Sequence, residues 1–239
     1  MKILITGGAS GLAASIVRRL AAENGNTVYF TFSRSATAAK EIEALYPNAH
    51  SIKCDFTDPS SIEDMLTQIP AIDPDVLINN ANGGIHKDHF YKTDHTVFAK
   101  SFEQNIIPTI RITQEAIKGF RKKKFGKIIN IISSYVVNKP PTGLSEYVAN
   151  KAYLLSLSKS WANELIRFNI TSNSISPSFM LTGLTADTDE RVIEQMTEAH
   201  PLKKILTTEE VADTVLFLTG ASQHINGMNL LMNAGSDVV

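Results

Sequence analysis

Short apolar runs alternate with longer helical patterns along this 239-residue chain, and this alternation limits the fold more than any other feature. Runs of strand length lie at 3–5, 27–32, 49–54, 75–78, 126–132, 170–175 and 229–232. Helical patterns cover about 13–22, 59–68, 96–121, 146–167 and 209–218, and a further helix ends near residue 45. Strands that are apolar on both faces and alternate with helices predict a doubly wound parallel sheet with helices on both sides.

The composition narrows the possible classes of protein. Hydrophobic residues make up 43% of the chain and charged residues 20%, so residues 1–239 can bury one substantial core, and we expect a single domain. The net charge of −1 gives no reason to expect a nucleic-acid or membrane partner. A single cysteine, Cys54, excludes an intramolecular disulfide. The short apolar start shows no signal peptide, so we expect a soluble cytoplasmic protein.

A glycine-rich turn follows the first strand, with the sequence Thr6-Gly-Gly-Ala-Ser-Gly-Leu-Ala13. Glycines allow a tight turn and a close approach to a pyrophosphate, which the amino end of the following helix then binds through free N–H groups. In this strand–turn–helix context the turn predicts a Rossmann-type dinucleotide site.

Tyr147 and Lys151 are the residues most suited to proton transfer. Four positions apart on a helix, they project from the same face. A cation beside a phenol favours the phenolate, so we expect Lys151 to lower the pKa of Tyr147 from about 10 and make it an acid–base group near neutral pH. Because this spacing also arises by chance, a surface tyrosine with a solvated lysine is the alternative.

The end of the second strand indicates which dinucleotide is bound. A carboxylate there would bind the ribose 2′-hydroxyl of NAD, but the sequence reads Phe32-Ser33-Arg34-Ser35. Arg34 can pair with a 2′-phosphate and Ser33 can donate a hydrogen bond to it, which predicts NADP. The alternative is that Arg34 is a solvated loop residue.

Several motifs in order resemble the short-chain dehydrogenase/reductase family over nearly the whole chain. Its Thr-Gly-x-x-x-Gly-x-Gly pattern matches the first turn, except that Ala13 replaces the last glycine. Ser134 lies thirteen positions before Tyr147, the usual family spacing. Asn82 and Ser178 stand where the family has glycine. The cofactor-binding residues that the resemblance and the turn imply are Gly7, Ser10, Gly11, Leu12, Ser33, Arg34, Asp55, Phe56, Asn80, Ala81, Asn82, Tyr147, Lys151, Pro177 and Thr182.

The same resemblance implies a catalytic group of Ser134, Tyr147, Lys151 and Asn105, with Asn105 supporting a water that connects the lysine to solvent. The expected reaction is NADP-dependent reduction of a carbonyl, and the layout is most similar to the 3-oxoacyl carrier-protein ketoreductases of fatty acid or polyketide biosynthesis. A reductase of free cyclic or aromatic ketones and a non-catalytic cofactor sensor are the alternatives. We expect residues 183–204 to form a substrate loop or lid, and Val136, Phe179 and Met196 to line the pocket.

Remaining clusters concern partners and metals. By the same resemblance, a basic group could dock an acyl carrier protein, although solvation and the helix dipole are the favoured explanation. This group comprises Arg121, Lys122, Lys123, Lys124 and Arg167. By resemblance, the chain should form a homodimer or homotetramer through the two long helices. His86, His89 and His95 lack a supporting cysteine or paired acid, so we expect no metal.

Overall fold

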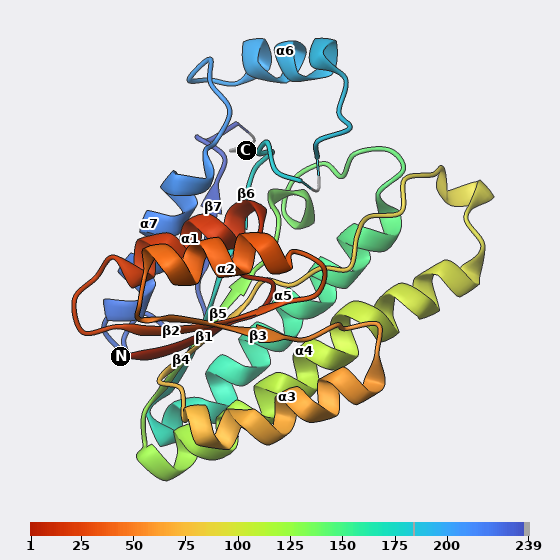
Figure 1. Cartoon of the computed structure of the whole chain (residues 1–239). Coiled ribbons are helices and arrows are strands. Elements are labelled where there is room, and N and C mark those ends of the chain that lie inside the picture. The colour runs from red at the N-terminus through yellow and green to blue at the C-terminus, as the bar shows by residue number, and fades with distance from the viewer. Residues whose placement is uncertain (184, 237–239) are drawn as a thin grey trace.

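A seven-stranded parallel sheet runs through the centre of the molecule (Figure 1). This computed structural model describes residues 1–183 and 185–236. The strand order is β3-β2-β1-β4-β5-β6-β7. The chain adds strands outward from β1 in one direction and then from β4 in the other, so the order reverses between β1 and β4. The strands are β1 Lys2–Ile5, β2 Thr27–Phe32, β3 Ala49–Lys53, β4 Val76–Asn79, β5 Gly126–Ile131, β6 Ile170–Pro177 and β7 Asn229–Met232. In open α/β sheets, ligands bind at the carboxyl ends of strands beside such a reversal of order.

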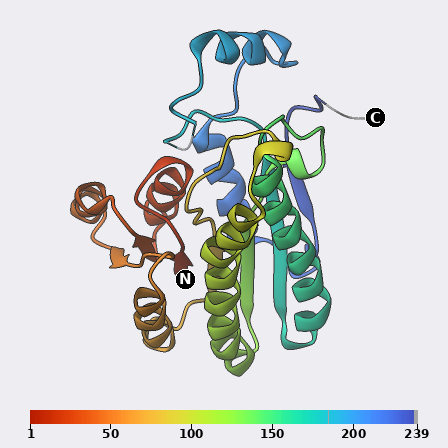
Figure 2. The same cartoon turned by 90° about the vertical axis from the view of Figure 1, so that its right-hand side faces the viewer.

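Helices cover both faces of the sheet (Figures 1 and 2). One face carries α1 Gly11–Ala21, α2 Ala36–Leu45 and α7 Thr208–Gly220, and the other carries α3 Pro59–Ile72, α4 His95–Lys123 and α5 Ser145–Leu165. Three short 3-10 helices are η1 Phe90–Lys92, η2 Ser134–Val136 and η3 Ile166–Phe168. The fold class predicted from the alternating pattern is therefore confirmed. No helix in the described ranges is long and apolar enough to cross a membrane.

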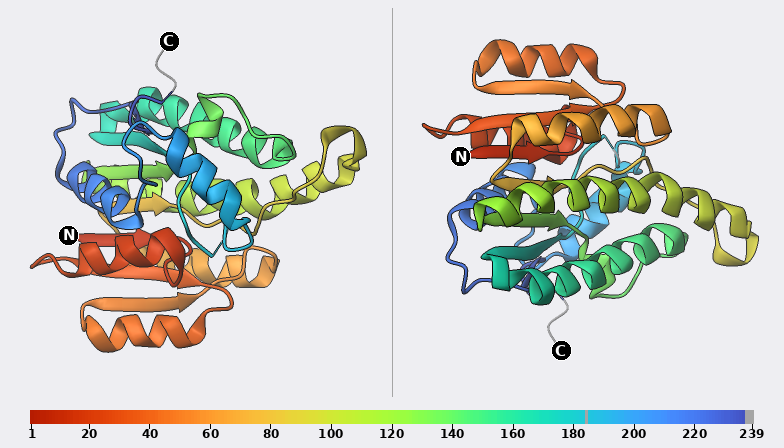
Figure 3. Two further views of the ribbon diagram at one scale, coloured as in Figure 1. Left: turned by 90° about the horizontal axis from the view of Figure 1, so that it is seen from above. Right: turned by 90° about the horizontal axis from the view of Figure 1, so that it is seen from below.

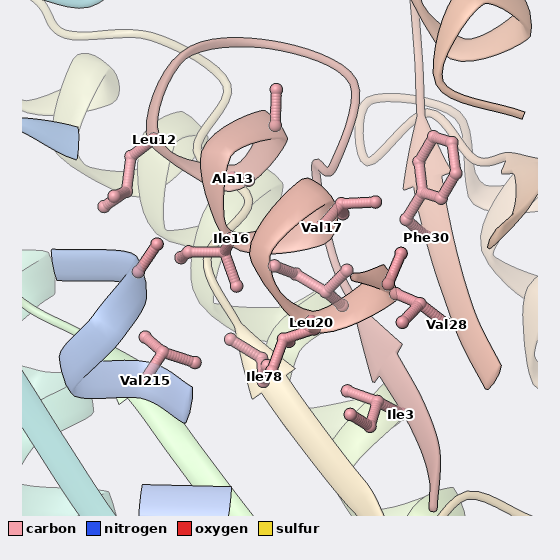
Figure 4. Packing of buried hydrophobic residues seen from close by; sticks show 14 of the residues in the cluster. Ile3, Leu12, Ala13, Ile16, Val17, Leu20, Val28, Phe30, Ile78 and Val215 are labelled. Atoms are coloured by element: carbon pink, nitrogen blue, oxygen red, sulfur yellow. The ribbon is translucent and has the colours of Figure 1, made fainter. Parts of the chain in front are cut away.

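The first helix is fixed against the sheet by a dense apolar cluster (Figure 4). Ile16, Val17 and Leu20 are fully buried, and they pack with side chains of β1, β2, β4 and α7. Ala13 is also buried in this cluster, so the alanine that replaces a family glycine fits the helix–sheet contact. This packing holds the amino end of α1, and the turn before it, at the carboxyl edge of the sheet.

Residues 183–204 differ from the expected long loop because they contain a helix, α6 Glu190–Ala199. The Asp189 side chain caps it by accepting a hydrogen bond from the Arg191 N–H at 2.8 Å. No residue of α6 is buried, although Val192, Ile193 and Met196 form an apolar stripe at helical spacing. Seen from above, α6 crosses over the carboxyl ends of the strands (Figure 3, left).

Candidate active site

The glycine-rich turn has the backbone geometry that phosphate binding requires. Gly7 and Gly11 have φ values of 76° and 52°, which favour glycine, and a Cβ on Gly8 would lie 2.5 Å from the Cβ of Phe30. The Ser10 side chain makes no cap hydrogen bond to α1. The N–H groups of the first turn of α1 are therefore available to an anionic ligand at the positive end of the helix dipole.

Thr6 joins this turn to the end of β4. Its hydroxyl oxygen accepts hydrogen bonds from the N–H groups of Asn80 and Ala81, each at 3.0 Å. The carboxyl ends of β1 and β4 are thus held together where the strand order reverses. The backbone around the turn is fixed before any ligand arrives.

A cavity of about 840 Å³ extends from this turn along the carboxyl edge of the sheet. This volume is within the range of cofactor sites. All fifteen residues expected to bind the dinucleotide line it: Gly7, Ser10, Gly11, Leu12, Ser33, Arg34, Asp55, Phe56, Asn80, Ala81, Asn82, Tyr147, Lys151, Pro177 and Thr182. The narrow glycine turn, the free helix end and the cavity volume fit a nicotinamide dinucleotide. The roles of the individual side chains remain predictions.

One end of the cavity carries a polar group at the ends of β2 and β3. The Ser33 hydroxyl donates to Asp55 Oδ2 at 2.9 Å, and the Thr57 N–H donates to Asp55 Oδ1 at 2.9 Å. The hydrogen bonds from Thr57, more than those from Ser33, hold the pKa of Asp55 below its usual value. Arg34 also lines this end of the cavity, beside these groups.

The other end brings Tyr147 and Lys151 together from α5. Lys151 Nζ lies 5.8 Å from the centre of the Tyr147 ring, and it donates a hydrogen bond to the Ile131 carbonyl oxygen at 2.8 Å. Lys151 is only 8% exposed, and burial lowers its pKa to about 8. An ammonium with this pKa can gain and lose protons close to neutral pH.

The expected effect of Lys151 on the phenol is wrong for this structure. Burial raises the pKa of Tyr147 to about 12, and a side-chain hydrogen bond with Ser133 offsets this only in part. The lysine ammonium is directed to the Ile131 carbonyl, so the loss of hydration around the phenol dominates. Tyr147 is therefore held as the neutral phenol, the form that can donate a proton.

The structure brings Ser133, rather than Ser134, to the phenol. Ser133 lines the cavity and bonds to Tyr147, whereas Ser134 is 3% exposed and is absent from the described lining. Ser133 is the second residue after β5 and lies fourteen positions before Tyr147. The prediction of Ser134 rests on its spacing of thirteen residues from Tyr147. The position of each serine relative to the end of β5 is the signal that indicates Ser133 instead.

Asn105 occupies a second, smaller cavity behind the pair. This cavity of about 20 Å³ is lined by Asn105, Tyr147 and Lys151, with Glu146 and Asn150 also present. Asn105 Oδ1 accepts a hydrogen bond from the Gly83 N–H at 2.6 Å, which ties α4 to the loop after β4. The sequence placed Asn105 near Lys151 correctly, but it gave no indication of Glu146.

The expected substrate residues separate in space. Phe179 lines the large cavity, but Val136 packs against the apolar cluster of Ile106, Ile132 and Leu154. Met196 lies on α6, outside the described lining. Tyr135 of η2 and Lys87 of the loop after β4 also line the cavity. Lys87 lies in an irregular segment with no periodic pattern to mark it.

Lys87 also links the mouth of the cavity to the segment before α6. Its ammonium donates to both carboxylate oxygens of Asp187, at 2.8 and 2.9 Å. This ion pair connects the loop after β4 with residues 183–204 across the opening. It is exposed to solvent, so its contribution to stability is small.

Asn82 and Ser178, at two positions where the family has glycine, fit the local backbone without strain. Asn82 is absent from the non-glycine residues with positive φ in the described chain, and its Oδ1 accepts a hydrogen bond from the Gly84 N–H at 3.1 Å. The positive φ occurs instead at Gly84, where it is 132°. The Ser178 N–H donates to the Met232 carbonyl at 2.9 Å.

Within the described ranges, no three potential ligand side chains are grouped to hold a metal.

The chain is similar in sequence to known reductases. Residues 7–237 match the family model described as enoyl-(acyl carrier protein) reductase. The chain is 32% identical to a 3-oxoacyl-(acyl-carrier-protein) reductase of Aquifex aeolicus, with 94% of this chain and 95% of that protein covered. The corresponding reductase of Escherichia coli is 29% identical, and the match covers 94% of this chain and 95% of that protein.

A solved structure described as a short chain dehydrogenase/reductase family protein superposes with a TM-score of 0.86. Its sequence is 30% identical, and the match covers 100% of this chain and 98% of that one. The chain therefore belongs to the short-chain dehydrogenase/reductase family and is an oxidoreductase that uses a nicotinamide cofactor.

Proposed function

We propose that this protein is an NADP-dependent ketoreductase that converts a 3-oxoacyl thioester into the 3-hydroxyacyl thioester. The observation that carries the proposal is the convergence of Ser133, Tyr147 and Lys151 in a cavity that the glycine-rich turn also lines. A cofactor and a carbonyl substrate can therefore meet beside a proton donor. The names of the relatives support the thioester as substrate.

The residues that line the cavity would hold the nicotinamide cofactor, which would supply the hydride for the carbonyl carbon. The Ser133 hydroxyl donates a hydrogen bond to the carbonyl oxygen, and Tyr147 transfers its phenolic proton to that oxygen as negative charge develops. Lys151 returns a proton to the phenolate, which its pKa of about 8 allows near neutral pH. The neutral phenol and the protonated lysine make the site suited to reduction.

We infer that residues 183–204 close over the substrate. They carry α6 across the carboxyl edge of the sheet, and the Lys87–Asp187 ion pair joins them to the opposite side of the cavity mouth. The apolar side chains of α6 include Val192 and Met196, and none of the helix is buried. Closure would bring these side chains toward an acyl chain and exclude water from the reacting carbonyl.

An acyl carrier protein could bind only some members of the basic group, because others already have partners within the chain. The group comprises Arg121, Lys122, Lys123, Lys124 and Arg167. Lys123 already pairs with Asp73 and Asp75, at 3.2 and 2.9 Å. Arg121 and Arg167 lie over the Phe168 ring, at 4.6 and 4.8 Å. These residues lie at the amino end of β5, about 20 Å of strand away from the cavity. A carrier bound there would more easily serve the cavity of a neighbouring subunit.

Such a neighbour is consistent with the surfaces of α4 and α5. Ile107 and Tyr153 remain 39% and 43% exposed, as apolar side chains of these two helices. We propose a homodimer or homotetramer through this surface, in a cytoplasmic protein. Light scattering in solution measures the state directly.

The substrate assignment predicts which carbonyls are reduced. With NADPH as donor, 3-oxoacyl thioesters on a carrier protein should be reduced fastest, the same acyl groups on a short thiol more slowly, and free cyclic or aromatic ketones most slowly. NADPH oxidation across this panel is the measurement. Tyr147→Phe should lower kcat by about 10²- to 10⁴-fold, since the acid is removed while the cavity keeps its shape. Faster reduction of free ketones, or retained turnover by this variant, contradicts the assignment.

The cofactor assignment predicts a lower KM for NADPH than for NADH. Arg34 lines the cavity beside Ser33, where a 2′-phosphate would be bound. Arg34→Ala should raise the KM for NADPH by about tenfold or more, the loss of one charge-assisted contact, and change the KM for NADH little. Steady-state kinetics with both cofactors give the answer. Equal effects on the two would show that Arg34 does not read the phosphate.

A further inference from the structure

A buried carboxylate without a basic partner lies immediately before the tyrosine of the site. Glu146 is in the first turn of α5 and is only 4% exposed. Across residues 1–183 and 185–236, neither Glu146 nor Lys151 forms a direct ion pair. Burying an uncompensated charge is costly, so two such groups of opposite sign in one region require an explanation.

The carboxylate is held by a polar network between α4 and α5. Ser101 Oγ donates a short hydrogen bond to Glu146 Oε1, and Asn150 Nδ2 donates to the same oxygen at 2.9 Å. Ser101 Oγ in turn accepts hydrogen bonds from Asn105 at 3.1 Å and from Asn150 at 2.9 Å. The network fixes the position of the carboxylate and connects it to Asn105.

The two buried charges line the same small cavity. Its volume of about 20 Å³ matches a single water molecule, and Glu146, Lys151, Asn105 and Asn150 are among the residues that line it. Lys151 uses one of its three N–H donors on the Ile131 carbonyl, which leaves others for the cavity. A water here would have enough partners to be ordered.

We propose that Glu146 and Lys151 form an ion pair bridged by one water in this cavity, and that Glu146 is thereby a positioning residue that keeps Lys151 protonated. The inference rests on the proposed function for its catalytic meaning. Burial lowers the pKa of Lys151 to about 8. A carboxylate one water away would keep this pKa from falling further. The lysine then remains able to return a proton to Tyr147.

Other titratable groups near the pair are few. Tyr147 lines both cavities, and Tyr135 faces Tyr147 from η2. The remaining titratable residues along the large cavity are Arg34, Cys54, Asp55 and Lys87. None of these four lines the small cavity, so Glu146 is the acid in the described wall that can act on Lys151 through a single water.

The test is the titration of Lys151 itself, followed by ¹³C NMR of its Cε and assigned with Lys151→Met. Glu146→Gln keeps the shape of the side chain and removes the charge. We expect it to lower the pKa of Lys151 by about one unit or more, because an opposite charge at close range shifts a pKa by that amount. Ser101→Ala is the matched control, since it removes a hydrogen bond to the same carboxylate and leaves the charge.

A Lys151 pKa that is equal in the wild type and in Glu146→Gln overturns the proposal, as does an equal drop in Ser101→Ala. Should the glutamine variant not fold, Glu146→Met replaces it, because it lacks the amide donor that would face the Asn150 amide. The alkaline limb of kcat/KM for reduction should shift with the NMR value. If the wild-type protein reduces no carbonyl of the panel, the proposed function fails, and the NMR comparison still decides the ion pair.

Discussion

A buried lysine ammonium lies at each end of strand β5, that of Lys127 from the strand itself and that of Lys151 from α5, and the two have different functions. At its amino end, Lys127 is 5% exposed and donates to the carbonyl oxygens of Leu218 and Ala221 at the end of α7. At its carboxyl end, Lys151 is 8% exposed and donates to the carbonyl of Ile131. Burial lowers the pKa of both.

The difference lies in what surrounds each ammonium. Lys127 satisfies the last carbonyls of a helix, where a cation is favoured by the dipole, and it is outside the described lining of both cavities. Lys151 lines two cavities and lies beside a phenol and a buried carboxylate. A perturbed pKa is therefore insufficient to identify a functional lysine; an open space beside a reacting group is also required.

Substitution of the two lysines by methionine should give opposite results. Lys151→Met is expected to lower kcat by about 10²- to 10⁴-fold, because Tyr147 loses its proton source. Lys127→Met should change kcat less than about twofold, but lower the free energy of unfolding by about 1–2 kcal/mol through unpaired α7 carbonyls. Carbonyl reduction and denaturant unfolding measure the two effects. Similar kinetics for both variants would remove the distinction between the ends of β5.

The adjacent serines at the carboxyl end of β5 provide a sharper comparison. Ser133→Ala should lower kcat by about 10²-fold, since a donor to the developing oxyanion is lost. Ser134→Ala should leave kcat within about twofold, because Ser134 is absent from the described lining of the large cavity. Single-turnover reduction rates separate the two. A larger defect in the second variant would restore the serine chosen from the motif spacing.

The pH profile distinguishes the lysines without abolishing activity. Reduction requires protonated Lys151, whose pKa is lowered to about 8, so kcat/KM should be constant below that pH and fall up to tenfold per unit above it. Lys127→Met should retain this limb, since the amino-end lysine does not touch the site. Initial rates measured from about pH 6 to about pH 10 locate this alkaline limb. A limb displaced in this variant would show that Lys127 contributes to it.

Much of the fold was predictable because its signals are local. Apolar runs of strand length, broken by helical periods, predicted the parallel sheet, and β2 and β7 have the bounds expected from the sequence. Helix α6 was missed although Val192, Ile193 and Met196 have helical spacing within it. Val136 and Met196 were misplaced because the sequence does not show which side of η2 or of α6 faces the cavity.

The sequence by itself determined the order of the motifs: a glycine turn after the first strand, a basic rather than acidic end to the second, and a tyrosine and lysine one helical turn apart. These depend on residue types and spacings along one element. Only the tertiary structure decided that Ser133 meets the phenol, that burial raises the pKa of Tyr147 to about 12, and that Glu146 shares a cavity with Lys151. Hydration and charge at each group depend on side chains from α4, α5 and β5, which are brought together only by folding.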